Sequence, residues 1–522
     1  MVPFSYAGIT LAPRSPGAPR HRCLLFQMAS SSKDTPEVIP RGRLRAMSLG
    51  VLLLLSCAPH GGTVDVQPNL LLISIDTLRA DRLSCYGYPR PTSATIDQLA
   101  AEGALFREVI VPRGQTWPSL TSLFTGEEPI VHGVRTNGQK LASSRRTLAT
   151  DLRDSGYATA AFLTNMIEAT HPGIDSLVIC RMFGVPQWKW DEKAVRAGVS
   201  WLAERESQPW FAWIHLIDPH MPYAPASPLD TLYRRGLPPG PAATLSEFAE
   251  LAIDSTAVPA TLVNHFIGLY DGQVNGVDGH VAEILAAVDS LSLRERTLIL
   301  VIADHGEDLF ERNRYFGHSC SIYHPTLHVP LLISFPGVVQ RGIVDVPMAS
   351  TDIRATLLDL LGCASSEVVP GESRANWIRE TGSSPRQSEG ALGGVESPAD
   401  SFQSLIEWAE EKPGGDRVIY GLRDSRWKYV SNPDDYRIDN DVFTGRDGHS
   451  YRVAIEELYD LAADPWELTN VVALHPERAA RMKAALANRV AQGTALARGS
   501  AAASDSVDAA TAEALRALGY VK

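Results

Sequence analysis

Two acidic residues stand at the ends of apolar runs in the sequence. Asp76 closes the run NLLLISID at 69–76, and Asp304 closes TLILVIAD at 297–304 and is followed by His305. Because ligand sites in open α/β sheets lie beyond the carboxyl ends of the strands, both carboxylates are expected at one edge. Such carboxylates need a cationic partner, and this set of oxygen and nitrogen ligands suits one divalent ion, Ca²⁺, Mn²⁺ or Zn²⁺. Either aspartate alone could be a turn cap, but the matched pair favours a metal site.

The segment GQTWPSLTSLFTG, residues 114–126, is the second feature that could do chemistry. Pro118 fits the first position of a helix, and Gly126 can end that helix. Thr116 would then lie just ahead of a helix N-terminus, where N–H groups and the helix dipole favour an anion. The position predicts a helix cap, whereas a nearby divalent metal would make the hydroxyl a nucleophile. The two interpretations are compatible.

Five short apolar runs predict strands that are buried on both faces, as in a parallel sheet. They cover residues 69–76, 157–164, 210–218, 297–304 and 329–335. Helix-like segments such as 95–106 and 277–291 alternate with these runs. The alternation predicts an α/β fold, a three-layer αβα sandwich with a mostly parallel central sheet.

The C-terminal third of the chain changes in character. Residues 364–415 are rich in Gly, Ser and Pro, which predicts a linker or surface insertion. Residues 416–490 combine alternating strand patterns with a helical segment, which predicts a small α+β subdomain with an antiparallel sheet. Residues 491–522 are Ala-rich and have a helical pattern, so we expect a helical tail.

Residues 1–60 have the pattern of a signal segment. Three arginines precede a short apolar run over 47–55, which is too short for a permanent membrane span. The sequence LLSC ending at Cys57 resembles a bacterial lipoprotein box, so we expect lipidation of Cys57 and anchoring to a membrane. The alternative is an ordinary signal peptide with an incidental cysteine. Both predict an exported protein of the periplasm or cell envelope.

Net charge and cysteine spacing argue against a nucleic-acid-binding protein, a zinc-cluster protein and a disulfide-rich protein. The chain of 522 residues has a formal net charge of −12, which argues against a nucleic-acid partner. Its six cysteines form no CxxC pair, so neither a zinc cluster nor a dense disulfide framework is indicated. The oligomeric state is not predicted.

Several long motifs resemble those of the sulfatase family, within the alkaline phosphatase superfamily. The opening motif covers residues 69–106, and a second block covers residues 297–337. GLRDSRWKYVSN, ELYDLAADPWELTNVV and ALRALGYV resemble the family's C-terminal subdomain and its usual ending. The resemblance spans roughly residues 66–522 in the family's order and implies that residues 66–363 form the catalytic domain.

The resemblance implies roles for six residues. Asp76, Asp304 and His305 should bind the metal, and Thr116 falls at the nucleophile in the frame nucleophile-x-Pro-Ser. His220, in DPHMPY, matches a histidine that contacts the substrate oxyanion or leaving group. His318, in FGHS, falls at or beside the position of a lysine that contacts the sulfate in many members.

The sequence also departs from the family pattern. A threonine at the nucleophile cannot be converted to formylglycine, and Leu120 replaces the arginine that normally supports that residue. Thr77 stands where many members have a second metal-binding aspartate, and a lysine-x-histidine motif is missing after residues 156–162. His215 is interpreted as a structural residue of its strand.

These departures bear on the ester that is cleaved. A phosphothreonine is hydrolysed more readily at a metal site than a sulfothreonine, because phosphoryl transfer relies on positioning and charge stabilisation. We therefore expect metal-dependent hydrolysis of a sulfate or phosphate ester in a small-molecule or glycan substrate. The alternatives are a transferase that moves a phospho-group to a cell-envelope glycan, and a non-catalytic binding protein on a decayed scaffold.

Overall fold

A computed structural model describes most of the chain after the predicted signal segment. The described residues are 67–165, 172–182, 185–205, 208–238, 240, 258–311, 316–318, 321–379, 402–410, 417–439 and 450–499. The predicted signal segment 1–60, including Cys57, lies outside them, as do residues 500–522 of the predicted tail.

The strands and helices alternate over the first two thirds of the chain. The strands are β1 (Asn69–Ile75), β2 (Ala104–Ile110), β3 (Ala158–Leu163), β4 (Ser176–Ile179), β5 (Trp210–Leu216), β6 (Thr297–Ala303), β7 (Asp308–Leu309), β8 (Phe316–Gly317), β9 (His328–Ser334), β10 (Gly342–Val344), β11 (Met348–Ala349), β12 (Ser404–Glu410), β13 (Arg417–Arg423), β14 (Trp427–Ser431), β15 (Arg437–Asp439), β16 (Ser450–Arg452) and β17 (Glu456–Asp460). The α-helices are α1 (Ala94–Glu102), α2 (Thr116–Thr125), α3 (Pro129–His132), α4 (Leu148–Asp154), α5 (Trp188–Ala203), α6 (Leu229–Leu232), α8 (Ala260–Ser290), α9 (His324–Leu327), α10 (Ile353–Leu361), α11 (Ala375–Ile378) and α14 (Pro476–Gly499).

The main sheet has the strand order β10-β2-β9-β6-β1-β5-β3-β4, and β11 also pairs with β2. Strand β9 runs antiparallel to both of its neighbours, and the other described pairings in this sheet are parallel. Every residue of β1, β5 and β6 is buried, as their continuous apolar runs predict. Burying each large apolar side chain contributes about 1.5–3 kcal/mol, so these central strands form a stable base for the site.

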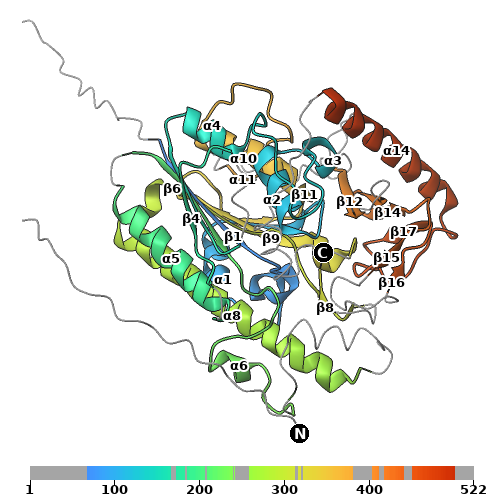
Figure 1. Cartoon of the computed structure of the whole chain (residues 1–522), viewed down its shortest axis with the longest axis horizontal. Coiled ribbons are helices and arrows are strands. Elements are labelled where there is room, and N and C mark those ends of the chain that lie inside the picture. Colours follow the sequence, from blue (N-terminus) through green and yellow to red (C-terminus); the bar gives the residue numbers. More distant parts are fainter. Residues whose placement is uncertain are drawn as a thin grey trace, which may run out of the picture. The chain divides into compact units, whose positions relative to one another are not determined.

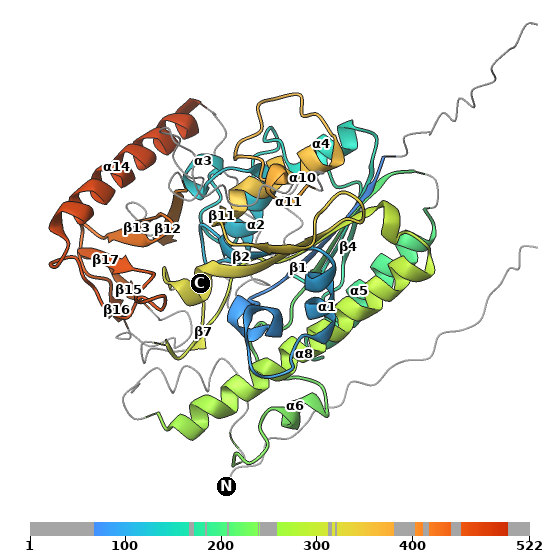
Figure 2. The ribbon, with the colours of Figure 1, turned by 180° about the vertical axis from the view of Figure 1, so that it is seen from behind.

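Helices cover both faces of the main sheet. Figures 1 and 2 show α1, α5 and α8 on one face and α2, α4 and α10 on the other. The expected three-layer αβα sandwich with a mostly parallel sheet is therefore confirmed.

A second, smaller sheet follows at the C-terminal end. Strands β12, β13, β14 and β17 form a four-stranded antiparallel sheet, and α14 packs against β13 and β14. This arrangement confirms the predicted α+β subdomain. Contacts group residues 63–522 into one compact unit, so the two sheets belong to a single body.

Three local predictions differ from the structure. The helix expected over 95–106 ends at Glu102, and β2 begins after Gly103, a position where the close backbone of Ile333 leaves no room for a Cβ. The predicted linker 364–415 contains α11 and β12, and β12 is an edge strand of the smaller sheet. The boundary expected near residue 490 falls inside α14, which runs to Gly499.

None of the helices in the described part of the chain combines the length and the hydropathy that a membrane span requires.

Candidate active site

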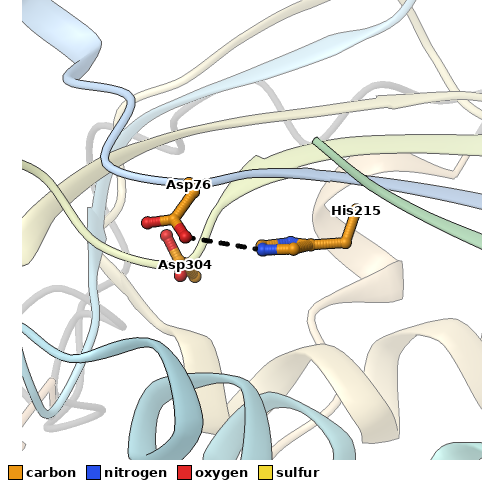
Figure 3. A group of neighbouring side chains, drawn as sticks. All are labelled: Asp76, His215 and Asp304. Carbon is orange, nitrogen blue, oxygen red and sulfur yellow. Dashed lines mark ion pairs between the residues drawn. The ribbon is translucent and has the colours of Figure 1, made fainter. Parts of the chain in front are cut away.

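Strands β1 and β6 bring Asp76 and Asp304 together. The two strands are parallel neighbours, and Ile75 of β1 pairs with Ala303 of β6. The two aspartates are the next residues along these strands, and both are buried (0% and 1% exposed). Figure 3 shows their carboxylates close together, as the sequence predicts.

The backbone around Asp304 fixes one of its carboxylate oxygens. Its Oδ1 accepts hydrogen bonds from the backbone N–H groups of His305 (2.7 Å) and Thr77 (3.2 Å). Thr77 has a positive φ of 55°, a strained conformation for a β-branched residue, and this conformation turns its N–H toward Asp304. The Oδ2 atom of Asp304 lies 3.6 Å from Nε2 of His305, and the Thr116 hydroxyl is also close enough to interact with this carboxylate.

The two carboxylates cannot both carry a charge without help. Burial and the negative charge of Asp76 raise the pKa of Asp304 well above its usual value. Burial would also raise the pKa of Asp76, but the electrostatic interactions with the nearby His220, His215 and His305 rings outweigh burial and lower it. A divalent cation between the two groups would supply the charge that lets both ionise.

His305 lies against both carboxylates. Its Nε2 atom is 3.7 Å from Oδ1 of Asp76 and 3.6 Å from Oδ2 of Asp304. Its Nδ1 atom lies 2.9 Å from the carbonyl oxygen of Gly306, so it donates there and leaves a lone pair on Nε2. Burial lowers the pKa of His305 to about 3, so the ring is neutral, as a metal ligand must be.

His215 also belongs to this site, although its position in a strand suggested a structural role. One atom each from Asp76, His215 and Asp304 lie within 4.8 Å of one another, which is close enough for one ion. The Nε2 atom of His215 is 3.6 Å from Oδ2 of Asp76 (Figure 3). The ring is held by Ser74 (2.7 Å to Nδ1) and by the amide nitrogen of Asn165 (2.8 Å to Nε2).

The hydrogen bonds of His215 define its tautomer. Trp213 donates its indole N–H to the Ser74 hydroxyl, and Asn165 donates its amide both to His215 and to Asp76 (3.3 Å). Nδ1 of His215 then donates to Ser74, and its Nε2 accepts from Asn165. The lone pair of His215 Nε2 is therefore held by an amide N–H, whereas that of His305 Nε2 lies near both carboxylates and the Thr116 hydroxyl. A polar residue in a fully buried strand is the only sequence signal that marks His215.

Thr116 lies at the same edge of the sheet. It is the first residue of α2 and is 0% exposed, and its Oγ1 atom is 3.4 Å from Nε2 of His305. The hydroxyl of Ser119, one turn further along, donates to the backbone carbonyl of Asp304. The structure thus brings the predicted nucleophile and the three predicted metal ligands together.

The predicted helix cap is wrong. Gln115 is the N-cap of α2 and makes no side-chain cap hydrogen bond, so Thr116 is already helical. Pro118 is the third helical residue rather than the first, and the backbone N–H of Trp117 is taken by Asn137 (2.9 Å). The helix start therefore offers an anion fewer donors than the sequence predicts. Gly126 ends the helix with a φ of 76°, as expected.

His220 and His318 complete the cluster. The ring centroid of His318 is 4.5 Å from that of His305 and 4.8 Å from that of His220. His220 uses Nδ1 to donate to the carbonyl oxygen of Met221 (2.5 Å). Burial lowers the pKa of both rings, that of His318 to about 4.

Glu307 is a site residue that the sequence reasoning missed. Strands β7 and β8 form a short hairpin in which Asp308 pairs with Gly317, so Glu307 and His318 are the next cross-strand pair. Oε1 of Glu307 and Nδ1 of His318 are 3.0 Å apart, and the carboxyl group is fully buried. Burial raises the pKa of Glu307 to about 8. The contact between Glu307 and His318 can be recognised only from the pairing of β7 with β8.

Comparison with known proteins agrees with this geometry. The Sulfatase family model matches residues 68–363, which is more than half of the chain. The chain belongs to the sulfatase family. Arylsulfatase K from Bos taurus is 28% identical over 204 residues, which cover 38% of this chain and 32% of that protein. The match thus spans about a third of the length of this sulfatase relative.

Two solved structures have the same fold. BT4656, in complex with its substrate D-glucosamine-2-N,6-O-disulfate, has a TM-score of 0.64 at 17% identity, covering 82% of this chain and 98% of that one. The phosphonate monoester hydrolase of Agrobacterium radiobacter has a TM-score of 0.62 at 21% identity, covering 82% and 96%. At these identities, the likeness shows the fold of this sulfatase-family chain and nothing finer.

Proposed function

We propose that this chain is a metal-dependent hydrolase of sulfate or phosphate esters in which Thr116 is the nucleophile. The observation that carries the proposal is the buried contact between Thr116 Oγ1 and His305 Nε2, beside the carboxylates of Asp76 and Asp304. Membership of the sulfatase family supports this class of reaction.

The donor set fits a divalent ion. Asp76, Asp304 and His305 would hold it, with His215 in reach as a fourth ligand if the amide of Asn165 moves away. The oxygen and imidazole ligands suit Ca²⁺, Mn²⁺ or Zn²⁺. Such an ion lowers the pKa of a neighbouring alcohol and neutralises charge on the transferred group.

The first step forms a covalent ester with the enzyme. Thr116 Oγ1 releases its proton to solvent and attacks the sulfur or phosphorus of the substrate, and the bond from that atom to the leaving oxygen breaks. The leaving oxygen takes up a proton, which His220 or His318, whose rings lie side by side at the site, would deliver in its protonated form. Glu307 would hold His318 in the orientation that this requires.

The second step must occur at the same sulfur or phosphorus atom. A threonine ester has no second hydroxyl on its Cβ, so elimination of the kind that formylglycine permits is not open to it. Water therefore attacks the sulfur or phosphorus, the bond to Thr116 Oγ1 breaks, and Oγ1 regains a proton. This requirement makes phosphate-type esters at least as plausible as sulfates, because phosphoryl transfer relies on positioning and charge.

The substrate class follows from the same reasoning and from the relatives. BT4656 is described with a disulfated glucosamine, and another structural neighbour hydrolyses phosphonate monoesters. We therefore infer a small-molecule or glycan ester that carries a sulfate, phosphate or phosphonate group.

A trapping experiment tests the proposal. Wild-type protein with Ca²⁺, Mn²⁺ or Zn²⁺ is mixed with 4-nitrophenyl sulfate, 4-nitrophenyl phosphate and a phosphonate monoester, quenched in acid and digested. We expect release of 4-nitrophenol and a mass increase of one sulfo or phospho group on the peptide that contains Thr116. Absence of turnover on all three esters with each metal would overturn the proposal.

We also propose that the protein is exported and anchored by a lipid on Cys57, since LLSC follows an apolar run at 47–55. Metabolic labelling with an alkyne fatty acid in a bacterial host tests this. We expect label on the wild type and none on Cys57→Ser. Equal labelling of both proteins would contradict the lipid anchor.

A further inference from the structure

The loop that leads into Thr116 is fastened to the smaller, C-terminal sheet. We propose that Arg113 is a positioning residue through which β12 holds Thr116 in its reactive place. This inference rests on the proposed role of Thr116 as the nucleophile. It assigns a function to the C-terminal sheet, which contributes none of the site residues described above.

Arg113 binds the residue immediately before Thr116. It is 2% exposed, and its Nε and Nη2 atoms both donate to Oε1 of Gln115, at 3.1 and 2.9 Å. A planar guanidinium holds one acceptor with two parallel N–H groups in this way, which fixes direction as well as distance. Because Gln115 Oε1 is used by Arg113, the side chain of this N-cap residue makes no cap hydrogen bond to α2.

The same guanidinium reaches strand β12. Its Nη1 donates to the backbone carbonyl of Glu407 (3.3 Å), and its Nη2 donates to that of Ala409 (2.5 Å). The backbone N–H of Glu407 in turn donates to the carbonyl of Pro112 (2.9 Å). The loop and the edge strand are therefore joined by a backbone bond at Pro112 and by two side-chain bonds from Arg113.

Strand β12 is itself firmly anchored. The carboxylate of Glu407, 0% exposed, accepts a charged hydrogen bond from Arg135 Nε at 2.7 Å. Arg135 also donates to the hydroxyl of Tyr420 on the neighbouring strand β13 (2.7 Å). Separating β12 from Arg135 would thus leave the buried carboxylate of Glu407 without its ion pair, which would lower the stability of the fold by several kcal/mol.

The geometry leaves Thr116 little freedom. Gln115, the residue before it, has an extended backbone (φ −146°, ψ 142°) and is held by Arg113. Trp117, the residue after it, is held by Asn137 through its backbone N–H. A displacement of about 1 Å at a reacting atom can cost about 10²-fold in rate. The hydrogen bonds from Arg113 to Gln115 connect the guanidinium to the residue that precedes Thr116.

Two substitutions test the positioning role from opposite sides of one hydrogen bond. Arg113→Lys keeps the charge but loses the pair of guanidinium N–H groups that bind Gln115. Gln115→Ala removes the acceptor without burying a new charge. For both, we expect kcat to fall by about 10- to 100-fold while KM changes by less than about threefold. In the double variant Arg113→Lys/Gln115→Ala, the losses should not add, because both remove the same contact.

Arg354→Lys is the matched control. Arg354 is also a buried arginine (3% exposed), and its Nη1 donates to the carbonyl of Thr125 at the opposite end of α2 (2.7 Å). We expect this change to lower the melting temperature while kcat per folded molecule stays within about threefold of the wild type. Equal loss of kcat in this control would show that any weakening of α2 suffices, and would overturn a specific role for Arg113.

Three outcomes separate the proposals. Methylguanidinium should restore part of kcat in Arg113→Ala and leave Arg354→Ala unchanged. If Thr116→Ala is as active as the wild type, the nucleophile is wrong and the proposed function fails on its own account. If Thr116→Ala is inactive but Arg113→Lys and Gln115→Ala keep wild-type kcat, the positioning role fails alone.

Discussion

The hydroxyl oxygen of Thr116 lies 3.4 Å from Nε2 of His305, and neither side chain is exposed to solvent. Since Nδ1 of His305 donates to the carbonyl of Gly306, its Nε2 carries no proton, and the Thr116 hydroxyl can donate either to this nitrogen or to the Asp304 carboxylate. The contact places the oxygen of Thr116 beside the imidazole that lies against Asp76 and Asp304. Its chemistry can therefore be tested with isosteric changes.

Replacement of Thr116 should separate the hydroxyl from the shape of the side chain. Thr116→Val keeps the volume and loses the oxygen, so we expect a loss in kcat of about 10³-fold or more. Thr116→Ser keeps the oxygen and should stay within about tenfold of the wild type. Steady-state kinetics on 4-nitrophenyl esters measures both. Similar kcat values for the two variants would show that the hydroxyl does not react.

The two candidate histidine ligands should differ in their effect on metal binding. Nε2 of His305 lies against both carboxylates and the Thr116 hydroxyl, which can give up its proton, whereas Nε2 of His215 accepts from the Asn165 amide, which cannot. We expect His305→Ala to weaken metal affinity by more than about 100-fold and His215→Ala by about tenfold or less. Calorimetric titration of each metal-free variant with the divalent ion gives both affinities. The reverse order would make His215 the ligand and leave His305 to act on Thr116.

Glu307 should matter through His318. Glu307→Gln keeps a hydrogen-bond partner for Nδ1 of His318, whereas Glu307→Ala leaves the ring free to turn. We expect Glu307→Gln to retain most activity and Glu307→Ala to lose about 10²-fold in kcat. If His318 acts on the leaving oxygen, the loss should be greater for phenyl than for 4-nitrophenyl esters. Equal losses for both leaving groups would place the effect elsewhere.

Stability should depend on pH through Asp191. Burial raises the pKa of Asp191 from 3.8 to about 7, although the N–H groups of Ile217 and Asp218 donate to its carboxylate. The folded state then binds more protons than the unfolded state between about pH 4 and 7. The stabilisation is complete below that window and is lost as the pH rises through it.

Urea unfolding of the wild type and of Asp191→Asn, without added metal, measures this effect. We expect the stability of the wild type relative to Asp191→Asn to fall by a few kcal/mol, in order of magnitude, from pH 4.5 to 7.5. A difference that is constant or grows with pH would contradict the raised pKa.

Removing one partner of the buried pair of Lys428 and Glu467 should destabilise the fold more than replacing both partners. Lys428 Nζ lies 2.7 Å from Glu467 Oε2 and also donates to the carbonyl of Ile322, and both side chains are almost fully buried. Lys428→Met should lower the free energy of unfolding by about 3–5 kcal/mol, because Glu467 stays buried and charged. Lys428→Met/Glu467→Gln should recover part of that loss. A double variant less stable than Lys428→Met would contradict this account.

The central strands could be predicted because burial on both faces leaves an apolar run without alternation. Strands β1, β5 and β6 lie within about two residues of the predicted ranges. Strand β2 was hidden because Arg107 and Glu108 interrupt its apolar residues and the helix α1 runs directly into it. Strand β12 was hidden because its sequence sits among Gly, Ser and Pro, and only its pairing with β13 defines it.

The candidate site was predictable where residues follow directly on a strand. Asp76, Asp304 and His305 needed only the rule that ligands bind at strand ends, and Thr116 needed the start of a helix. His215 could not be predicted in this way, since its role depends on its register beside Ser74 of the neighbouring strand. Glu307 depends on the hairpin that folds His318 back over it.

The pairing of Ile75 with Ala303 has a consequence for how this sequence can change. The separation of Asp76 and Asp304 is set by backbone hydrogen bonds between adjacent strands, not by the particular apolar side chains beneath them. Exchange of one apolar residue for another in β1 or β6 should therefore leave the pair in place. Deletion of a single residue from either strand would turn its aspartate to the opposite face of the sheet. The site should tolerate wide sequence drift in these strands but no change in their length.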